Sequence, residues 1–396
     1  MQRTFTARAQ RETRQVVLLD DAELASALHP LRDWAGGRRT LVVTTPTVYR
    51  LYGSAVSDVL AEHDVSILVL DCNESTKGVA QVERVCRSAH AMRLSRTDLL
   101  IGLGGGVCTD ITTVAASWLR RGIEHVRVPT TLLGQVDAGI GYKGAVNFDG
   151  HKSYIGCFHA PSHVLIVPRF LYSLPAHAIR EGFAEIIKIA MVRDAELFGL
   201  IEGHAVELVR TSFRSRPRHG LEVIWRAVQR MLEELGKNPY EDRTYERLVD
   251  FGHTFSPLLE AASRYRLSHG RAVAVDMALT TVISSKLGLV DTAFRERVLD
   301  TIASLELPVY SNHLTVELCE ESLRGALLHR GGKPNLVLPN GLGTAQFLGS
   351  ADDIGKGTFA AAIRVLEARH RQAPFETRQR QVPTTPSLTR WTSSEF

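Results

Sequence analysis

Residues 98–106 read Asp98-Leu99-Leu100-Ile101-Gly102-Leu103-Gly104-Gly105-Gly106, an apolar run that passes directly into three glycines. The apolar run predicts a buried strand, and the pattern of Ile111–Leu119 predicts a helix soon after it. Glycines between a strand and a helix N-terminus let a pyrophosphate approach backbone N–H groups and the positive end of the helix dipole. The glycine triplet alone fits a tight turn equally well, so it indicates a nucleotide site only together with other motifs.

Strands and helices alternate on both sides of this stretch. Further strands are predicted at Val16–Leu19, Thr40–Thr44, Ser66–Leu70, Val126–Leu133 and Val164–Val167, and helices at Ala22–Leu31, Pro46–His63 and Val79–Ala91. Such alternation indicates a parallel sheet covered by helices on both faces. From Ala176 onward the pattern is helical, with one short hairpin expected near Gly341–Leu348. We therefore expect an α/β domain at residues 15–175 and an all-helical domain at 176–370, with a flexible arm at 1–14 and a disordered tail at 371–396.

The bulk composition places the chain among soluble globular proteins. Its 396 residues suffice for two domains, with 44% apolar and 23% charged residues. The net charge is only +4, and the basic residues form no nucleic-acid motif. No apolar run could cross a bilayer, and the N-terminus lacks the apolar core of a signal peptide. Five cysteines without repeated spacing favour a reducing compartment, so we expect a cytoplasmic protein without membrane or nucleic-acid partners.

The strongest candidate site begins in the helical stretch at residues 181–190. Glu185 and Lys188 are three residues apart and project from the same side of that helix. Taken alone, they are best interpreted as an ordinary surface ion pair. His253 and His269, however, each stand beside a glycine and apolar residues, and with Glu185 they form a set of two imidazoles and one carboxylate. Such a set leaves a zinc-like ion open positions for a substrate, with Lys188 beside it.

Two loops add candidate anion contacts. Pro129-Thr130-Thr131 ends a predicted strand with hydroxyls suited to a nucleotide. The run from Asp137 to Phe148 contains three glycines around Lys143, which would bring backbone and ammonium close to an anion. A plain hairpin loop with a solvated lysine is the alternative.

Together these motifs resemble the sugar phosphate cyclases, the superfamily of 3-dehydroquinate synthase. The resemblance covers residues 40–350 and rests on Gly104-Gly105-Gly106-Val107 with Asp110, Pro129-Thr130-Thr131-Leu132, Asp137 with Lys143, Ala184-Glu185 with Lys188, Gly252-His253-Thr254 and His269-Gly270. It implies a Rossmann-like N-terminal domain, a helical C-terminal domain, an active site in the cleft between them and a homodimer. It also implies NAD and a divalent metal, zinc or cobalt, as cofactors.

The resemblance assigns roles by position. Glu185, His253 and His269 look like the metal ligands. The residues that resemble NAD contacts are Glu74, Lys77, Gly105, Gly106, Val107, Asp110, Thr130, Thr131, Lys152 and Ser173. The residues that resemble substrate or catalytic contacts are Asp137, Lys143, Lys188, Asp250, Arg121 and the metal ligand Glu185.

Within the superfamily, the segment Phe255-Ser256-Pro257 resembles enzymes that act on sedoheptulose 7-phosphate. Asp250 together with His329 resembles the 2-epi-5-epi-valiolone synthases, which form a C7 cyclitol and release phosphate. Ser153 and Glu181 replace asparagines of most relatives in the substrate pocket, Gly144-Ala145 replaces the usual Thr-Gly, and Thr45 replaces an aspartate that holds the adenosine ribose. The first two departures leave a 2-epi-valiolone synthase open.

The implied reaction is a transient oxidation by NAD⁺, phosphate elimination, reduction and aldol closure. The alternatives, in order, are another sedoheptulose 7-phosphate cyclase, a 3-dehydroquinate synthase and a metal-dependent polyol dehydrogenase, which would release NADH. A non-catalytic nucleotide-binding module is the hypothesis from another class, and the complete ligand set speaks against it.

Overall fold

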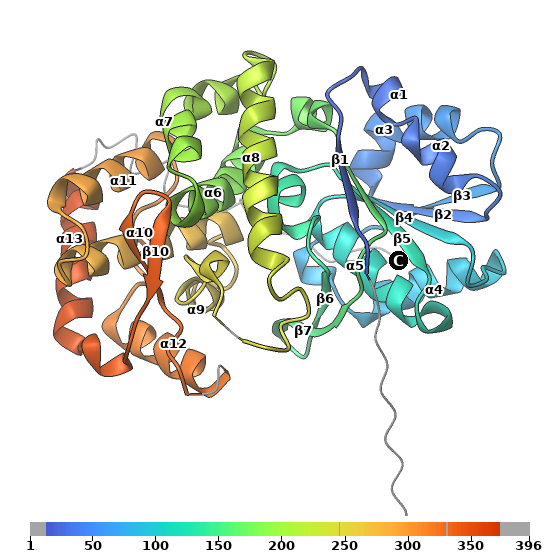
Figure 1. Ribbon diagram of the computed structural model, residues 1–396. Coiled ribbons are helices and arrows are strands. Elements are labelled where there is room, and N and C mark those ends of the chain that lie inside the picture. Colours follow the sequence, from blue (N-terminus) through green and yellow to red (C-terminus); the bar gives the residue numbers. More distant parts are fainter. Residues whose placement is uncertain (1–12, 245, 330–331, 373–396) are drawn as a thin grey trace, which may run out of the picture. The chain divides into compact units, whose positions relative to one another are not determined.

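A computed structural model describes residues 13–244, 246–329 and 332–372 of the chain (Figure 1). The predicted arm and tail lie almost wholly outside these residues. The chain packs into two compact units, and the description below is of the described residues of each. The first unit comprises Met1–Gly182 and Arg210–Arg243, and the second comprises Phe183–Val209 and Thr244–Phe396.

The first unit is built on a six-stranded sheet in the order β1-β8-β5-β4-β2-β3, in which all neighbours are parallel. Its strands are β1 (Val16–Leu19), β2 (Thr40–Thr44), β3 (Val65–Val69), β4 (Leu99–Gly104), β5 (Glu124–Pro129) and β8 (His163–Ile166). The predicted parallel sheet is thereby confirmed, and every predicted strand is present. The predicted strand at Val126–Leu133 ends at Pro129 because the following residues turn into a tight helical loop.

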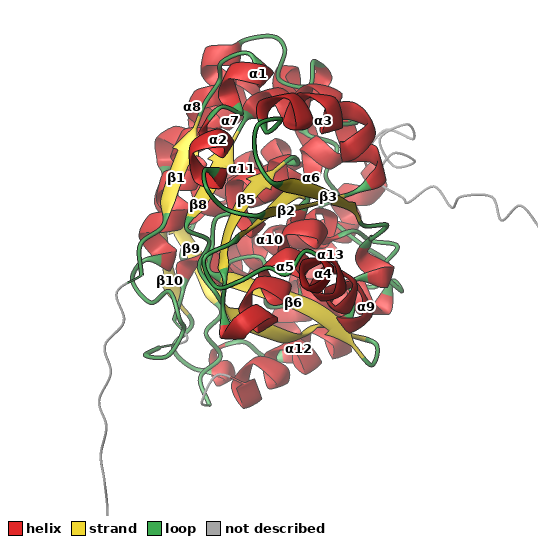
Figure 2. Cartoon of the chain, turned by 90° about the vertical axis from the view of Figure 1, so that its right-hand side faces the viewer, coloured by secondary structure: helices red, strands yellow, loops and turns green. Residues whose placement is uncertain are grey.

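Helices cover both faces of this sheet, as Figure 2 shows. They are α1 (Leu24–Ala27), α2 (Pro30–Ala35), α3 (Pro46–Val59), α4 (Val79–Ala91) and α5 (Gly106–Trp118). Successive strand residues point to opposite faces: Val42 packs into the core under α1, α2 and α3, while Leu41 and Val43 pack into the core under α4 and α5. The helix predicted at Ala22–Leu31 is broken in two, because Pro30 begins α2.

Two parts of the first unit were not predicted as such. An antiparallel hairpin is formed by β6 (Lys143–Phe148), the second half of the glycine-rich run, and β7 (His151–Phe158), where the sequence offered a hairpin loop only as the alternative. The helix α8 (Pro217–Leu235) groups with this unit, although the sequence placed it in the second domain. The reason lies in its contacts: Tyr240, just beyond α8, packs edge-on against Tyr142 and Phe158, and its hydroxyl bonds Thr13.

The second unit is helical except for one hairpin. Its first helices are the part of α6 (Ala176–Arg193) that begins at Phe183, and then α7 (Ala195–Arg210). The later helices are α9 (Ser256–Ala262), α10 (His269–Lys286), α11 (Thr292–Ser304), α12 (Val316–His329) and α13 (Lys356–Gln372). The hairpin is formed by β9 (Val337–Gly341) and β10 (Thr344–Phe347). In α10 every residue from Ala272 to Ser284 is buried, which marks it as the central helix of this unit. Among the described residues, no helix combines the length and apolarity needed to span a bilayer.

A buried arginine on β5 organises the loop between β5 and β6. The Arg127 side chain is fully buried and donates hydrogen bonds to four oxygens. The acceptors are the carbonyls of Ala138 (3.3 Å), Gly141 (2.8 Å) and Lys143 (2.8 Å) and the hydroxyl of Thr113 (3.0 Å). A guanidinium presents five N–H donors in a fixed planar fork, enough for these four acceptors, whereas an ammonium has only three. Arg127 therefore fixes the backbone path of the loop that carries Asp137 and Lys143.

Replacing Arg127 by Met should lower the free energy of unfolding by about 2 kcal/mol or more, because it leaves buried carbonyls without donors. Arg127→Lys should lose most of the same stability. The measurement is urea denaturation of the whole chain, with Arg84→Met on the exposed face of α4 as the control, expected within about 0.5 kcal/mol of the parent. Equal midpoints for Arg127→Met and the parent would contradict this role.

Candidate metal centre and nucleotide loop

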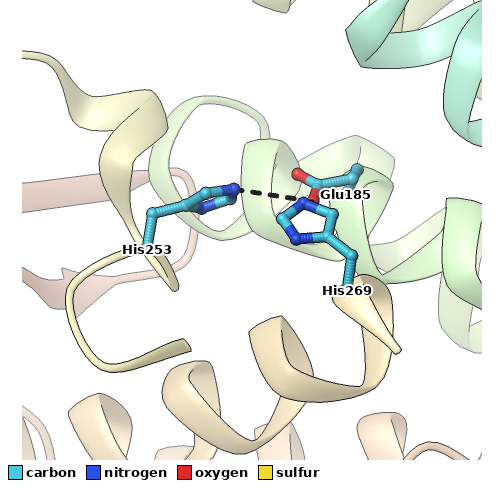
Figure 3. Close-up of side chains that lie close together, drawn as sticks. All are labelled: Glu185, His253 and His269. Atoms are coloured by element: carbon cyan, nitrogen blue, oxygen red, sulfur yellow. Dashed lines mark ion pairs between the residues drawn. The ribbon is translucent and has the colours of Figure 1, made fainter. Parts of the chain in front are cut away.

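Three predicted metal ligands converge in the second unit (Figure 3). Glu185 lies on α6, His253 in the turn before α9, and His269 is the first residue of α10. The Nε2 atoms of His253 and His269 lie 3.7 and 3.2 Å from the same carboxylate oxygen, Oε1 of Glu185. Residues far apart in the sequence thus share one point, as the sequence predicted.

The carboxylate at the centre of this group is removed from water. Glu185 is 1% exposed, and Lys188 is 3% exposed with its Nζ 2.6 Å from Oε2 of Glu185. Burial by itself would raise the pKa of Glu185, but Lys188 and the two imidazoles hold it well below its usual range. Every residue of α6 from Phe183 to Val192 is buried, so this part of the helix has no exposed side. The surface ion pair is therefore excluded.

The pKa values of the two imidazoles are shifted in opposite directions. Burial and the Lys188 ammonium lower the pKa of His253 to about 4, so its ring is neutral, and its Nδ1 lies 3.1 Å from the Phe251 carbonyl. Burial also acts to lower the pKa of His269, but its bonds to Glu185 and Glu260 raise it to about 9. Nδ1 of His269 lies 2.9 Å from Oε1 of Glu260, a buried residue on α9. Both rings thus have their Nδ1 atoms engaged and their Nε2 atoms aimed at Glu185.

This donor set fits a divalent ion. Ligand atoms bound at about 2.1 Å to one zinc ion lie at most about 4.2 Å apart, and both nitrogen–oxygen distances fall within that limit. Oε1 of Glu185 faces both Nε2 atoms, and within the described residues no hydrogen bond from outside this group of side chains occupies either oxygen of the carboxylate. The carboxylate of Glu260 behind His269 completes the carboxylate–histidine arrangement typical of metal sites. The sequence did not single out Glu260, whose only signal was an acidic residue among the apolar positions of a short helix.

Asp250 lies three residues before His253 in the same turn. Its carboxylate is 6% exposed and 2.6 Å from Nη2 of Arg247, while its carbonyl accepts the N–H of His253 at 2.9 Å. The candidate substrate contact and the candidate metal ligand therefore belong to one tightly bonded segment.

The first unit brings the glycine turn together with the threonine loop. Gly105 precedes α5 and Gly106 is its first residue, while the N–H of Thr130 donates to the Gly104 carbonyl at 2.9 Å. A side chain on Gly105 would lie 3.1 Å from the methyl group of Thr131. Val107 and Asp110 follow in the first turns of α5. Because these glycines have no side chains, a phosphate group can approach the backbone N–H groups at this helix N-terminus.

Three of the predicted NAD contacts, Glu74, Lys77 and Lys152, are linked through Asn147 or a residue next to them. Lys77 is 5% exposed, and its Nζ lies 2.6 Å from Oδ2 of Asp110. Asn147 donates its backbone N–H to the Lys77 carbonyl and its amide to Glu74, and it accepts the N–H of Ser153, next to Lys152. Asn147 is thus a residue that sequence reasoning missed, because its role depends on the unpredicted β6–β7 hairpin.

The first unit also holds the remaining predicted residues, Ser173, Arg121, Asp137 and Lys143. Ser173 is exposed after β8 and bonds the Tyr52 hydroxyl at 2.6 Å. Arg121 lies in an exposed turn beyond the far end of α5, about 20 Å from Gly106 for a helix of 13 residues. Asp137 is partly buried in the loop held by Arg127, and half-exposed Lys143 pairs with Glu241 in the same unit.

Glu260→Gln should weaken zinc binding about tenfold to a hundredfold, because the carboxylate orients His269 and makes its Nε2 more basic. The dissociation constant is measured by competition with a chromophoric chelator. Glu202→Gln, an exposed partner of Arg297 in the same unit, is the control and should bind zinc like the parent. Parent-like zinc affinity in Glu260→Gln would show that Glu260 does not support the site.

Two family models match consecutive parts of the chain. Residues 67–181 match the family described as 3-dehydroquinate synthase N-terminal, and residues 182–325 match 3-dehydroquinate synthase C-terminal. A 2-epi-5-epi-valiolone synthase of Streptomyces hygroscopicus subsp. jinggangensis is 43% identical, over 89% of this chain and 86% of that protein.

Solved structures agree with these matches. The structure of ValA, a 2-epi-5-epi-valiolone synthase from the same organism with NAD⁺ and Zn²⁺ bound, is 41% identical with a TM-score of 0.86, covering 92% of this chain and all of that one. A glycerol dehydrogenase from Schizosaccharomyces pombe, at 14% identity and a TM-score of 0.62 over 93% of this chain and 91% of that one, shares the fold alone. The two family matches and the 43% identical relative show that this chain belongs to the 3-dehydroquinate synthase family of sugar phosphate cyclases.

Proposed function

We propose that this chain is a 2-epi-5-epi-valiolone synthase, which converts sedoheptulose 7-phosphate to a C7 cyclitol with release of phosphate. The observation that carries the proposal is the convergence of Glu185, His253 and His269 beside the buried ammonium of Lys188. Two observations favour this enzyme over other members of the family: the 43% identical relative has that name, and the sequence has both Asp250 and His329.

Glu185, His253 and His269 would hold a divalent ion, zinc or cobalt, and the turn from Gly104 to Asp110 with Thr130 and Thr131 would hold NAD⁺. When bound, the nucleotide supplies reversible hydride acceptance and the ion supplies Lewis-acid stabilisation of a substrate oxygen. Because the hydride is returned later in the cycle, no net oxidation occurs.

The side chains of this protein supply positioning and proton transfer. Lys188 is held by Glu185 at 2.6 Å, so its ammonium can stabilise a hydroxyl that loses its proton during oxidation. The ketone formed acidifies the neighbouring C–H, and its proton passes to the departing phosphate, which we propose as the base, as the C–O bond to phosphate breaks. Lys143 and Arg121 are proposed to hold that phosphate through charge-assisted contacts. Asp137 and Asp250 are proposed to orient hydroxyls for ring closure.

We further propose that the enzyme is a cytoplasmic homodimer. All five cysteines are free, which agrees with a reducing compartment. The outer edge of β7 has no strand partner among the described residues, and Phe148, Tyr154 and Phe158 of this hairpin are 49%, 70% and 42% exposed. An apolar, unpaired edge of this kind favours association with a second copy. Analytical ultracentrifugation tests the dimer.

Incubation with sedoheptulose 7-phosphate, NAD⁺ and Zn²⁺ or Co²⁺ should release phosphate without accumulating NADH. Phosphate is followed by a colorimetric assay and NADH by its absorbance, and NMR identifies the product. Build-up of NADH would indicate a polyol dehydrogenase instead. Turnover of the 3-dehydroquinate synthase substrate, with none of sedoheptulose 7-phosphate, would place the chain in the other branch of its family.

Lys188→Ala should lower the rate of phosphate release a hundredfold or more while leaving NAD⁺ affinity unchanged, since the lysine acts on the substrate oxygen. Lys356→Ala, an exposed lysine of the same unit paired with Glu320, is the control and should turn over like the parent. NAD⁺ affinity is measured by calorimetry. Loss of NAD⁺ binding in Lys188→Ala would mean that this lysine serves the nucleotide.

A further inference from the structure

The turn that contains His253 leads into α9, and no side chain at the start of α9 caps this helix. The cap position of α9 is Phe255, whose side chain cannot accept a hydrogen bond, and Pro257 stands in its first turn. The N–H groups at a helix start have no partners within the helix, so another group has to accept them. Here that group comes from a different helix.

The acceptor is Asp276 on α10. Its Oδ2 accepts the N–H of Phe255 at 2.5 Å and that of Ser256 at 2.9 Å, and its Oδ1 accepts the hydroxyl of Thr280 at 3.1 Å. Asp276 is fully buried. Burial raises its pKa to about 6 against the opposing effect of these donors, so the carboxylate is ionised at pH 8. The result is a charged clamp on the two residues that follow His253-Thr254.

The same helix also supports the residue before His253. Gly252 has a φ of +76°, and a Cβ there would lie 2.9 Å from Cγ of Met277 and 3.0 Å from Cγ1 of Val273. Residues 252–256 therefore rest on the face of α10 formed by Val273, Asp276 and Met277. His269 stands at the start of α10, seven residues before Asp276, and seven residues are close to two helical turns.

We propose that Asp276 is the positioning residue for His253, so that one helix sets both imidazoles: His269 directly and His253 through the Asp276 clamp. The inference rests on the metal role proposed above but not on the identity of the substrate. Without the clamp, the turn from Gly252 to Ser256 loses its ionic anchor, and Nε2 of His253 is no longer held 3.7 Å from Glu185. Metal affinity then falls, because ligands have to be held in place before the ion arrives.

The test measures metal binding by the purified full chain at pH 8. Asp276→Asn and Asp276→Ser are compared with the parent by zinc titration against a chelator and by the visible absorption spectrum of bound Co²⁺. We expect about tenfold or greater weakening and a changed Co²⁺ spectrum, in line with the loss of other groups that orient metal ligands. His253→Ala and the double variant His253→Ala/Asp276→Asn complete a double-mutant cycle. Because Asp276 acts through His253, the double variant should bind zinc no more weakly than His253→Ala.

The matched control is Asp291→Ala. Asp291 also caps a helix of the second unit, accepting the N–H of Phe294 at 2.7 Å, but α11 carries no metal ligand. This variant should melt at a lower temperature and keep the zinc affinity and Co²⁺ spectrum of the parent.

Three results would contradict the proposed role of Asp276, and one would contradict the metal site itself. An Asp276 variant that folds, by circular dichroism, with parent-like zinc affinity and Co²⁺ spectrum overturns the inference. So does additional weakening in the double variant, or failure of both Asp276 variants to fold while Asp291→Ala folds, since Asp276 would then support the unit as a whole. If His253→Ala itself binds zinc like the parent, the proposed metal site fails instead, independently of Asp276.

Discussion

A carboxylate almost without access to water is the constraint on which the second unit depends. Placing the Glu185 charge in a protein interior costs several kcal/mol unless partners and hydrogen bonds compensate for it. The compensation comes from the Lys188 ammonium one turn away and from two imidazoles that approach Oε1. A divalent cation held by Glu185, His253 and His269 would also balance this buried charge.

The surrounding helices are arranged to meet this demand. Burial of α6 from Phe183 to Val192 excludes water from the ion pair, and His269 begins α10, which is buried from Ala272 to Ser284. Glu260 fixes the ring of His269 from behind, at 2.9 Å. In the first unit Arg127 has a comparable place, because one buried charge there sets the path of a whole loop through its carbonyl contacts. In both units a buried charge fixes irregular backbone near residues that carry chemistry.

The sequence predicted what is encoded locally. Apolar runs located all six parallel strands, and α4 has the predicted bounds. The ligands Glu185, His253 and His269 were found because their motifs are short and contain chemically distinctive residues. Roles that arise from packing were not predictable in this way. Nothing near Asn147 indicates that it joins Glu74, Lys77 and Ser153, because those contacts exist only once β6 and β7 pair. Likewise α8 reads as one more amphipathic helix, and its place in the first unit depends on where Tyr240 packs.

Every described side chain proposed to hold or position the ion, Glu260 and Asp276 included, comes from one unit, whereas the glycine turn belongs to the other. The side chains proposed for the ion and those proposed for the dinucleotide thus belong to different packing units, so the effect of a substitution on each cofactor can be measured separately.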